Sequence, residues 1–316
     1  MTGRELQVSI VIPTYNGGSL FEDCLARIFE QQVEFVYEVI VIDSGSIDGT
    51  LQILKKYPVQ VSTIPNSAFN HGSTRNRGIE ISSGELVVLI TQDAIPANDY
   101  WLSNLVKNFE DKAVAGVYCR QVPRETADVL TKRNLDNWLA GRPNRVVNYV
   151  ARKTAYACLT PMERLQLCTI DNVCCCIRKS VWEKTPFVKA NFAEDLEWGK
   201  EVILAGYKIV YEPEAVVVHS HDRSVLYEYK RTYLCHRRLY QLHGLHTIPK
   251  LKYAFSNYFN DVVTDARYVL IQEKNRARAL LLLLKLPILS LAKIVGQYKG
   301  AKDEKYGHTL KTYKDV

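Results

Sequence analysis

Short apolar runs alternate with amphipathic segments along the first 120 residues. Runs rich in Val and Ile predict buried strands over residues 8–12, 36–42, 59–64, 86–91 and 114–119. The segments between them predict helices near residues 19–32, 50–56, 71–82 and 100–110. Strands that alternate with helices in this way are typical of βαβ units. The pattern therefore predicts an α/β, Rossmann-like fold in which helices flank a mainly parallel sheet.

The pattern changes twice after residue 120. From 128 to 167 it is irregular, and an insertion of this kind in an α/β enzyme commonly shapes the pocket for a second substrate. A strand at 173–177, a helix at 194–204 and a short strand at 215–218 follow, and nearly everything after His221 has a helical pattern. We therefore expect one domain over 1–222, made of two halves (1–120 and 121–222), and a largely helical C-terminal region over 223–316.

The charge is distributed unevenly between these two regions. Residues 1–222 carry 23 Lys and Arg against 27 Asp and Glu, whereas residues 223–316 carry 18 against 7, within a net charge of +7. The 47% hydrophobic content is enough for a folded core. A basic region beside a mildly acidic one predicts a separate surface for an anionic partner, either anionic lipid or a phosphorylated acceptor.

The cysteines and the N-terminus indicate the compartment. No cationic, apolar and small-residue series opens the chain, so we expect a cytosolic protein with reduced thiols. Cys174, Cys175 and Cys176 lie in an apolar run, where alternate residues of a strand are buried as small hydrophobic side chains. There is no CxxC pair and no zinc-ligand spacing.

Polar segments follow the predicted strands, at the edge where open α/β sheets bind ligands. These segments are Pro13-Thr14-Tyr15-Asn16, 43–50, Thr91-Gln92-Asp93 and His219-Ser220-His221. Neither GxGxxG nor GxxxxGK[ST] occurs, which excludes the dinucleotide fingerprint and the P-loop. A ligand at this edge must therefore be held by another arrangement.

Several segments, in order, resemble the family 2 inverting glycosyltransferases, which have the GT-A fold. Residues 9–16 (SIVIPTYN) and 41–50 (VIDSGSIDGT) resemble the opening of that family. Residues 69–76 (FNHGSTRN), 91–94 (TQDA), 193–199 (AEDLEWG) and 219–221 (HSH) resemble the bacterial rhamnosyltransferases within it. The resemblance covers about the first 235 residues, by motif order and α/β pattern.

The resemblance implies that the half 1–120 binds the nucleotide sugar and the half 121–222 binds the acceptor, with the nucleotide-sugar site at the carboxyl ends of the first strands. Its expected residues are Pro13, Thr14, Tyr15, Asn16, Asp43, Ser44, Asp48, His71, Arg75, Gln92 and Asp93. A carboxylate at the position of Asp43 suits the imide N–H of a pyrimidine base, while the alternative is that Asp43 and Asp48 cap the turn and helix that follow. A guanidinium at Arg75 suits phosphate or sugar hydroxyls.

A nucleoside diphosphate leaving group requires positive charge to stabilise it, and hard oxygen ligands suit Mg²⁺ or Mn²⁺. The family usually carries an Asp-x-Asp triad whose second Asp binds the metal, and here only that second residue, Asp93, is present. His219 and His221 share one face of a short strand, so the comparison implies metal binding by His221 and a phosphate contact at His219. The alternative for Asp93 is a turn cap before Pro96.

Inverting transfer needs a base that takes the proton of the acceptor hydroxyl. The family pattern implies that Asp195 is this base and that Glu194 orients the acceptor. The alternative is a favourable interaction of Glu194, Asp195 and Glu197 with a helix N-terminus. Further contacts with acceptor or phosphate are expected from the residues Asn172, Trp198, His219 and Arg231.

The resemblance thus implies a metal-dependent enzyme that moves L-rhamnose from dTDP-β-L-rhamnose to a hydroxyl of a cell-surface glycan such as O-antigen. The alternatives are a UDP-sugar donor or a non-catalytic scaffold of a glycan assembly complex. The expected acceptor is polyprenyl-diphosphate-linked, which would suit peripheral attachment of the C-terminal region to the inner membrane. No nucleic acid partner is expected, and the oligomeric state is not indicated.

Overall fold

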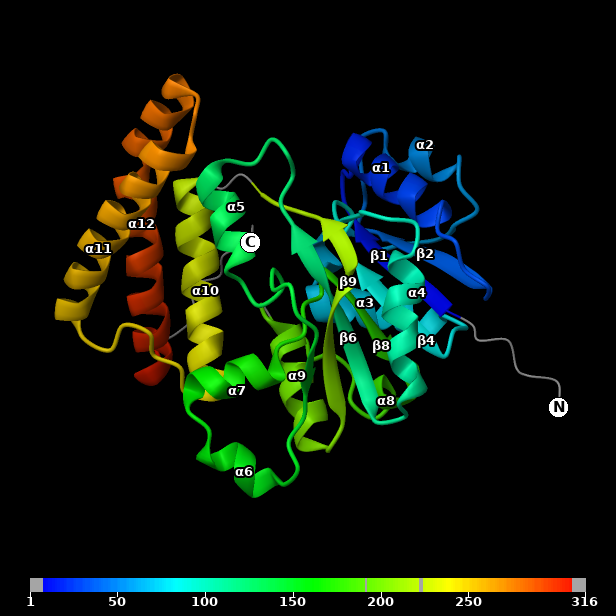
Figure 1. Cartoon of the computed structure of the whole chain (residues 1–316). Coiled ribbons are helices and arrows are strands. Elements are labelled where there is room, and N and C mark those ends of the chain that lie inside the picture. Colours follow the sequence, from blue (N-terminus) through cyan, green and yellow to red (C-terminus); the bar gives the residue numbers. More distant parts are fainter. Residues whose placement is uncertain (1–7, 191, 222–223, 309–316) are drawn as a thin grey trace. The chain divides into compact units, whose positions relative to one another are not determined.

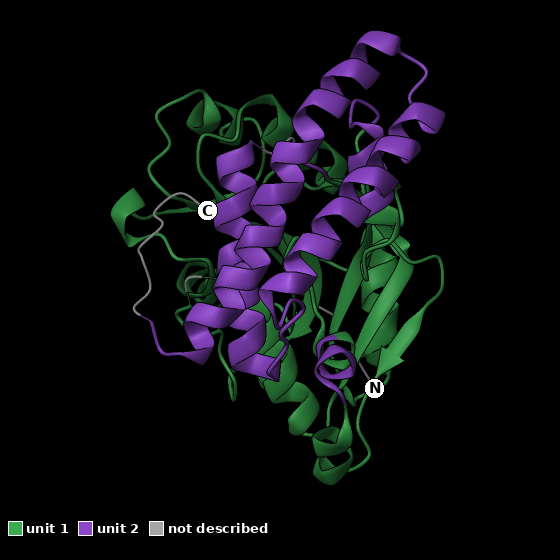
Figure 2. Ribbon diagram, turned by 90° about the vertical axis from the view of Figure 1, so that its left-hand side faces the viewer, with its two compact units in different colours: residues 1–124, 135–159, 166–219 green, residues 125–134, 160–165, 220–316 purple. Residues whose placement is uncertain are grey.

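The computed structural model describes residues 8–190, 192–221 and 224–308, and it divides into two compact units. Unit 1 comprises residues 1–124, 135–159 and 166–219, and unit 2 comprises residues 125–134, 160–165 and 220–316 (green and purple in Figure 2). The domain boundary expected between residues 222 and 223 lies outside the described residues. Two short segments of the irregular region, 125–134 and 160–165, belong with the C-terminal helices.

Unit 1 is built on one mixed sheet of order β3-β2-β1-β4-β8-β6-β9-β5, with β7 paired to β9 (Figure 1). The strands are β1 (Val8–Thr14), β2 (Tyr37–Asp43), β3 (Gln60–Thr63), β4 (Leu86–Ile90), β5 (Ile95–Pro96), β6 (Val114–Val122), β7 (Val146–Asn148), β8 (Cys174–Arg178) and β9 (Lys208–Val218). The helices are α1 (Gly18–Phe29), α2 (Thr50–Leu54), α3 (His71–Ile81), α4 (Trp101–Val106), α5 (Val129–Asp136), α6 (Lys153–Cys158), α7 (Pro161–Cys168), α8 (Lys179–Trp182) and α9 (Glu194–Leu204). Helices α5 and α7 each cross a boundary between the units.

The sheet is parallel on one side and mixed on the other. Strand β1 runs parallel to β2 and β4, whereas β8 lies antiparallel between β4 and β6, and β6 runs parallel to β9. Strands β1, β2, β4, β6 and β9 therefore all point the same way. Their carboxyl ends meet at one edge of the sheet, and the turn that leads into β8 reaches the same edge.

Alternation along the strands fills a core layer on each face of the sheet. In β1, Ile10 and Ile12 pack with Phe21 of α1 and Trp101 of α4, whereas Val11 packs on the other face, in the cluster that includes Trp198 of α9. In β8 the cysteines divide in the same way: Cys174 and Cys176 on one face, Cys175 on the other. The predicted burial of this triplet is confirmed.

Some elements are longer or more regular than the sequence pattern predicted. Strand β6 continues to Val122 and β9 begins at Lys208, while residues 128–167 hold three helices and β7 in place of an irregular insertion. Strand β7 is paired with β9 through the register Val147 to Val210. Its two valines favour an extended conformation, and the pairing with β9 stabilises it.

Unit 2 contains three long helices, α10 (Val225–His243), α11 (Leu251–Gln272) and α12 (Arg276–Lys305), as the helical pattern after His221 predicted. Helix α12 approaches α10 closely at two glycines. A Cβ on Gly296 would lie 3.0 Å from the carbonyl oxygen of Tyr229, and one on Gly300 would lie 2.3 Å from that of Tyr233. Only residues without a side chain allow this approach of two helix backbones.

A glycine of unit 1 sets the position of α9, which carries Glu194 and Asp195. A Cβ at Gly199 would lie 2.0 Å from the carbonyl oxygen of Cys168. We predict that Gly199→Ala displaces α9 and lowers the free energy of unfolding by about 1–3 kcal/mol. Urea denaturation measures this, with Gly49→Ala as control, since a Cβ there meets nothing within 4 Å. Equal stability of the two variants would contradict the prediction.

Candidate functional site

The first two loops at the ligand edge of the sheet are joined by hydrogen bonds. Asn16 takes a positive φ of 47°, its backbone N–H donates to the Ser46 hydroxyl, and its side-chain oxygen accepts from the N–H of Ile47. The N–H of Gly17 donates to Thr50. These contacts fix the β1–α1 loop against the β2–α2 loop, where a nucleotide site is predicted.

The Asp43 carboxylate is used by its own turn. It accepts hydrogen bonds from the N–H groups of Gly45 and Ser46 and from the Ser46 hydroxyl, and it is almost completely buried. Asp48 likewise accepts from the N–H of Thr50, and hydrogen bonds from the Thr50 hydroxyl and from this N–H lower the pKa of its exposed carboxyl. The turn-capping alternative therefore describes both residues in this structure, and base binding by Asp43 stays a prediction.

Gln92 connects the ends of two neighbouring strands. Its side-chain oxygen accepts from the Thr14 hydroxyl at 2.6 Å and from the N–H of Tyr15, and its amide nitrogen donates to the carbonyl of Tyr15. This bridge holds the end of β1 against the loop after β4. Pro13, Thr14 and Ser44 are fixed within the same strand ends, since the N–H of Ser44 donates to the carbonyl of Thr14.

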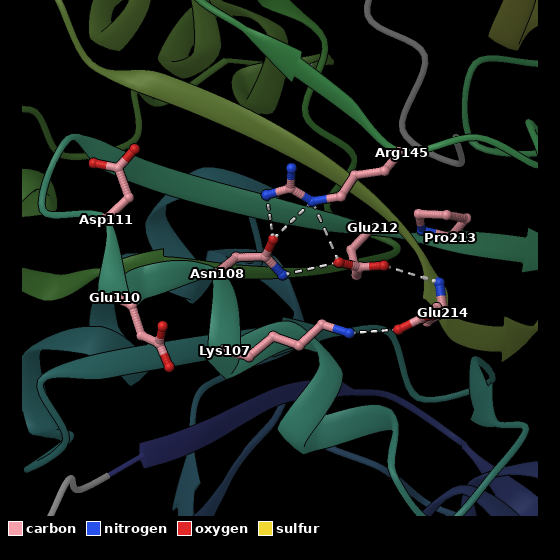
Figure 3. Close-up of a pocket in the computed structure, with 8 residues that line it drawn as sticks. All are labelled: Lys107, Asn108, Glu110, Asp111, Arg145, Glu212, Pro213 and Glu214. Carbon is pink, nitrogen blue, oxygen red and sulfur yellow. Dashed lines mark hydrogen bonds and ion pairs between the residues drawn. The ribbon is translucent and has the colours of Figure 1, made fainter.

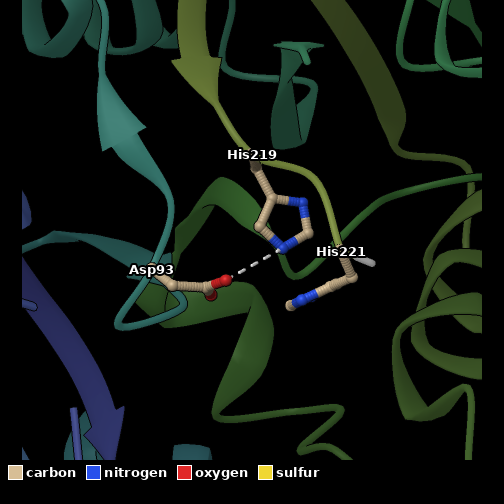
Figure 4. A group of neighbouring side chains, drawn as sticks. All are labelled: Asp93, His219 and His221. Atoms are coloured by element: carbon tan, nitrogen blue, oxygen red, sulfur yellow. Dashed lines mark ion pairs between the residues drawn. The ribbon is translucent and has the colours of Figure 1, made fainter. Parts of the chain in front are cut away.

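Asp93, His219 and His221 form a cluster whose ligand atoms all lie within 4.8 Å of one another (Figure 4). The Asp93 carboxylate lies 3.1 Å from the Arg124 guanidinium and 3.7 Å from Nε2 of His219. Arg124 also donates to the carbonyl of Asp93. One carboxylate and two imidazoles form a donor set for a divalent transition ion, and Arg124 adds a fixed positive charge.

Two residues behind His219 determine which of its nitrogens carries the proton. The amide nitrogen of Gln121 donates to Asp171 at 2.7 Å, so its oxygen faces Nδ1 of His219 at 3.1 Å. That oxygen can only accept, so we assign the proton of neutral His219 to Nδ1. Nε2, the nitrogen nearer Asp93, then presents its lone pair. A hydrogen bond of this kind behind a ligating histidine orients it toward a metal.

Glu194 is held by a buried ion pair at the start of α9. Nη1 of Arg75 donates to the Glu194 carboxylate at 2.8 Å, and both side chains are about 95% buried. The amide of Asn172 donates to the same carboxylate oxygen. Burial alone would raise the pKa of Glu194, but Arg75, His71 and the hydrogen bond from Asn172 together outweigh it, so the pKa lies below its usual value and the carboxylate keeps its charge.

Asp195 lies beside this pair and has the opposite electrostatic environment. Its carboxylate accepts from the N–H groups of Asn172 and Leu196. Burial, then the negative charges of Glu194 and Asp171, raise the pKa of Asp195 to about 8. Ala193, just before the two acids, has a strained left-handed backbone with φ 56°. A carboxyl whose pKa lies near the working pH suits general base catalysis.

A continuous series of contacts connects Asp93 to Asp195 within unit 1. Asp93 faces His219, His219 contacts Gln121, and Gln121 donates to Asp171. Asp171 precedes Asn172, whose N–H donates to Asp195. Residues from β4, β6, β9, the turn before β8 and α9 therefore meet at one edge of the sheet. The predicted metal ligand and the predicted base occupy one polar network.

Other predicted residues have structural environments of their own. The Arg75 guanidinium is buried against Glu194 and the carbonyl of Asn172, which makes it a partner of the acidic pair. His71 contacts Arg75, and burial together with the Arg75 charge lowers its pKa. Trp198 lies in the core, packed on Phe187, so its ring has no exposed face for stacking on a sugar. Arg231 is a partly exposed residue of α10 in unit 2.

Sequence reasoning did not find three residues of this network: Gln121, Arg124 and Asp171. The first two follow the part of β6 that the apolar run revealed, which ended at Cys119. The strand in fact continues three residues further. Polar residues that follow a strand, as Asp43 and Asp93 do, are candidates for the ligand edge, and a longer predicted strand would have selected Gln121 and Arg124 in the same way. Asp171 stands beside Asn172, which was selected, but nothing in the sequence indicated that β8 enters antiparallel.

A separate hollow of about 660 Å³ lies elsewhere on unit 1 (Figure 3). It is lined by Lys107, Asn108, Glu110, Asp111, Arg145, Glu212, Pro213 and Glu214. Four of its charged residues are paired within it, Lys107 with Glu214 and Arg145 with Glu212, and Asp111 pairs with Lys208 outside it. None of the predicted site residues lines it, and its paired groups leave the strand-end network as the candidate site.

Comparison with known sequences identifies relatives of one kind. Residues 9–171 match the description "Glycosyl transferase family 2". The chain is 33% identical over 232 residues to the O-antigen chain rhamnosyltransferase RfbN of Salmonella typhimurium, covering 72% of this chain and 70% of the relative. It is 32% identical over 228 residues to the O-antigen chain rhamnosyltransferase WbaN of Salmonella anatum, covering 71% and 69%.

Solved structures with the same fold are more distant in sequence. The mannosyltransferase PcManGT of Pyrobaculum calidifontis, solved with GDP-Man and Mn²⁺, has a TM-score of 0.60 at 19% identity, covering 96% of this chain and 88% of that one. Glucosyl-3-phosphoglycerate synthase of Mycobacterium tuberculosis, solved with Mn²⁺, UDP and glucosyl-3-phosphoglycerate, has a TM-score of 0.53 at 19% identity, covering 76% and 81%. At these identities the likeness shows the fold alone.

The Arg75–Glu194 pair generates a stability prediction. Arg75→Met leaves the Glu194 charge buried without its partner, so we expect a loss of about 3–5 kcal/mol in the free energy of unfolding. Arg75→Met/Glu194→Met should recover most of that loss, because no uncompensated charge remains. Urea denaturation of the single and double variants measures both effects.

The matched control is the exposed ion pair Lys56–Glu22, where Lys56→Met should leave the denaturation midpoint nearly unchanged. A double variant at Arg75 and Glu194 that is no more stable than the Arg75 single variant would contradict the account of the buried charge.

Proposed function

Since the chain belongs to glycosyl transferase family 2, we propose that it transfers L-rhamnose with inversion, from dTDP-β-L-rhamnose to a hydroxyl of a cell-surface glycan. The chain is a glycosyltransferase with the GT-A fold that the sequence predicted. The rhamnosyltransferase relatives support the sugar. The polar network from Asp93 to Asp195 is the observation that supports this mechanism, because it connects the proposed diphosphate-binding residue and the proposed base at one sheet edge.

Asp195 is the general base of the proposed reaction. Its carboxylate takes the proton of the acceptor hydroxyl as the oxygen bonds to the anomeric carbon and the bond to the diphosphate breaks on the opposite face. The β-linked donor therefore gives an α-linked product. Glu194 stays ionised beside Arg75 and keeps Asp195 basic through its charge. Asn172 fixes both carboxylates, through its amide and its N–H.

Asp93, His219 and His221 hold the diphosphate end of the donor in this proposal. A divalent ion held by these three residues would supply positive charge to the departing diphosphate. Mg²⁺ prefers oxygen ligands, whereas imidazole nitrogens suit first-row transition ions, so the donor set favours Mn²⁺ over Mg²⁺. Arg124, fixed on Asp93, contributes a permanent charge to the same end of the donor.

The nucleoside end of the donor is assigned to the joined β1–α1 and β2–α2 loops. Thr14, Tyr15 and Asn16 lie at the end of β1 there, and Asp43, with Ser44 next to it, is at the end of β2. A UDP-sugar is the alternative donor, because both pyrimidines present the same imide edge. The non-catalytic scaffold is the other alternative, and the raised pKa of Asp195 beside a metal-ligand cluster favours an enzyme.

The acceptor is proposed to be a polyprenyl-diphosphate-linked glycan at the cytoplasmic face of the inner membrane. The relatives are O-antigen chain enzymes, and the basic composition of residues 223–316 suits an anionic acceptor or surface. Arg231 of α10 remains a proposed contact for its phosphates.

The pKa of Asp195 generates a prediction about pH. The base must lose its proton to act, so kcat/KM should rise about tenfold per pH unit up to about pH 8 and then level off. Asp195→Asn should lower kcat about 10²–10⁴-fold and abolish this dependence, with dTDP-rhamnose binding retained. Steady-state rhamnosyl transfer between pH 6 and 9 measures both, with Glu201→Gln on the same helix as control.

The same group gives a readout that does not involve catalysis. Its pKa is higher in the folded than in the unfolded state, so the fold retains a proton that unfolding releases between about pH 4 and 8. Stability from this group is therefore lost as pH rises through 8. Asp195→Asn should melt above the parent at pH 9 by at least about 2 °C, and the difference should vanish near pH 4. A parent protein that melted above Asp195→Asn at pH 9 would contradict the raised pKa of Asp195.

Donor and metal are tested by thermal shift. With Mn²⁺ present, dTDP-rhamnose at a hundredfold excess over its Kd should stabilise the protein by about 2.7 kcal/mol. UDP-glucose and UDP-GlcNAc should stabilise it less. Asp93→Asn should remove the part of the shift that depends on metal, and Asp111→Asn, on an exposed ion pair, should not. If only the UDP-sugars stabilised the protein, the donor would be a UDP-sugar and the proposal of dTDP-rhamnose would be wrong.

A further inference from the structure

Helices α11 and α12 of unit 2 expose a row of large apolar side chains. On α12 these are Leu280, Leu281, Leu284, Ile288 and Leu291, each more than half exposed. On α11 the row contains Phe255, Phe259, Val263 and Leu270. Residues spaced three and four apart share one side of a helix, so each helix carries a continuous apolar stripe.

The two stripes lie on the same face of the helix pair. Ala254 and Tyr258 of α11 pack with Ile294 and Tyr298 of α12, and Lys293 pairs with Asp261, so the helices run antiparallel. Viewed along each helix from its N-terminus to its C-terminus, the exposed stripe lies roughly a quarter turn around the helix axis, in the same sense of rotation, from the side that carries the packed residues. Because the two helices run in opposite directions, the same quarter turn on each helix brings both stripes to the same side of the helix pair. The stripes therefore form one surface, which we call the hairpin face.

The C-terminal half of α12 packs on two neighbouring helices. Gly296 and Gly300 lie against the backbone of α10, and Ile294 packs on α11. Among the described residues α12 alone is long and apolar enough to cross a bilayer, but a third of its most apolar window is buried. A helix that packs on two neighbours and exposes a single apolar side suits the plane of a membrane interface.

The exposed charges of the segment that carries the hairpin face have one sign. Between residues 250 and 300, all of which the structure describes, the exposed charged side chains are Lys250, Lys252, Arg267, Lys274, Arg276, Arg278, Lys285 and Lys299. The acidic residues of this segment are less exposed, and two of them are paired, Asp261 with Lys293 and Asp265 with Arg133. Cations beside an apolar surface attract anionic headgroups.

We propose that the hairpin face docks on an anionic lipid bilayer, with the apolar stripes of α11 and α12 inserted among the acyl chains and the flanking cations at the headgroups. A second copy of the chain is the other occupant that an apolar stripe suggests. A symmetric pairing through this face would bring two sets of cations together, which opposes association. The proposal concerns unit 2 and does not depend on the donor or on catalysis.

The test is co-sedimentation of the full chain with vesicles. Vesicles with about 30% phosphatidylglycerol in phosphatidylcholine should bind at least about tenfold more tightly than pure phosphatidylcholine, and added salt should weaken binding. Leu284→Glu/Ile288→Glu should reduce binding to the anionic vesicles about tenfold or more. Val36→Glu, which changes an apolar residue of unit 1 with the same exposed fraction as Ile288, should bind as the parent does.

Three further measurements keep the result interpretable. Hydrogen exchange should show residues 276–291 protected by anionic vesicles in the parent, and thermal denaturation should show that the double variant is folded. The proposal is overturned if the parent does not bind anionic vesicles, or if the folded double variant binds as well as the parent. It is equally overturned if gel filtration shows a dimer that Leu284→Glu/Ile288→Glu dissociates without any change in vesicle binding.

Discussion

The buried ion pair between Arg75 and Glu194 is the interaction on which the candidate site depends. Each charge would be strongly unfavourable alone in the interior, so the two side chains stay together in the folded unit 1. Because Arg75 belongs to α3 and Glu194 opens α9, the pair fixes the start of α9 beside the turn before β8. Asp195 is placed as a consequence, since the next residue of the helix lies within reach of the N–H of Asn172.

The same pair separates the protonation behaviour of two adjacent carboxyl groups. Arg75 keeps Glu194 charged, and the charge of Glu194, with burial, keeps a proton on Asp195 near neutral pH. Two neighbouring acids whose pKa values are driven apart have different chemical roles. A guanidinium that seemed from the sequence to be a ligand clamp therefore acts through the acids it holds, which is a different task from binding phosphate directly.

The sequence predicted the fold and most of the strand-end residues, because apolar runs and the polar residues after them are local signals. It could not predict that β8 lies antiparallel between β4 and β6, since strand direction depends on pairing between distant segments. That insertion brings Asp171 and Asn172 to the site. The environment of Trp198 was equally non-local, because its burial depends on Phe187 and on the glycine at 116.

Helix α12 shows why hydrophobicity along a sequence does not determine what a helix contacts. Its apolar residues serve two purposes that composition does not distinguish: one set packs on α10 and α11, and the other faces outward. An apolar stripe that stays exposed to water contributes no hydrophobic free energy. The cations beside it repel the same surface of a second copy of the chain. An apolar surface with positive charges beside it is complementary to a partner that has both acyl chains and negative headgroups.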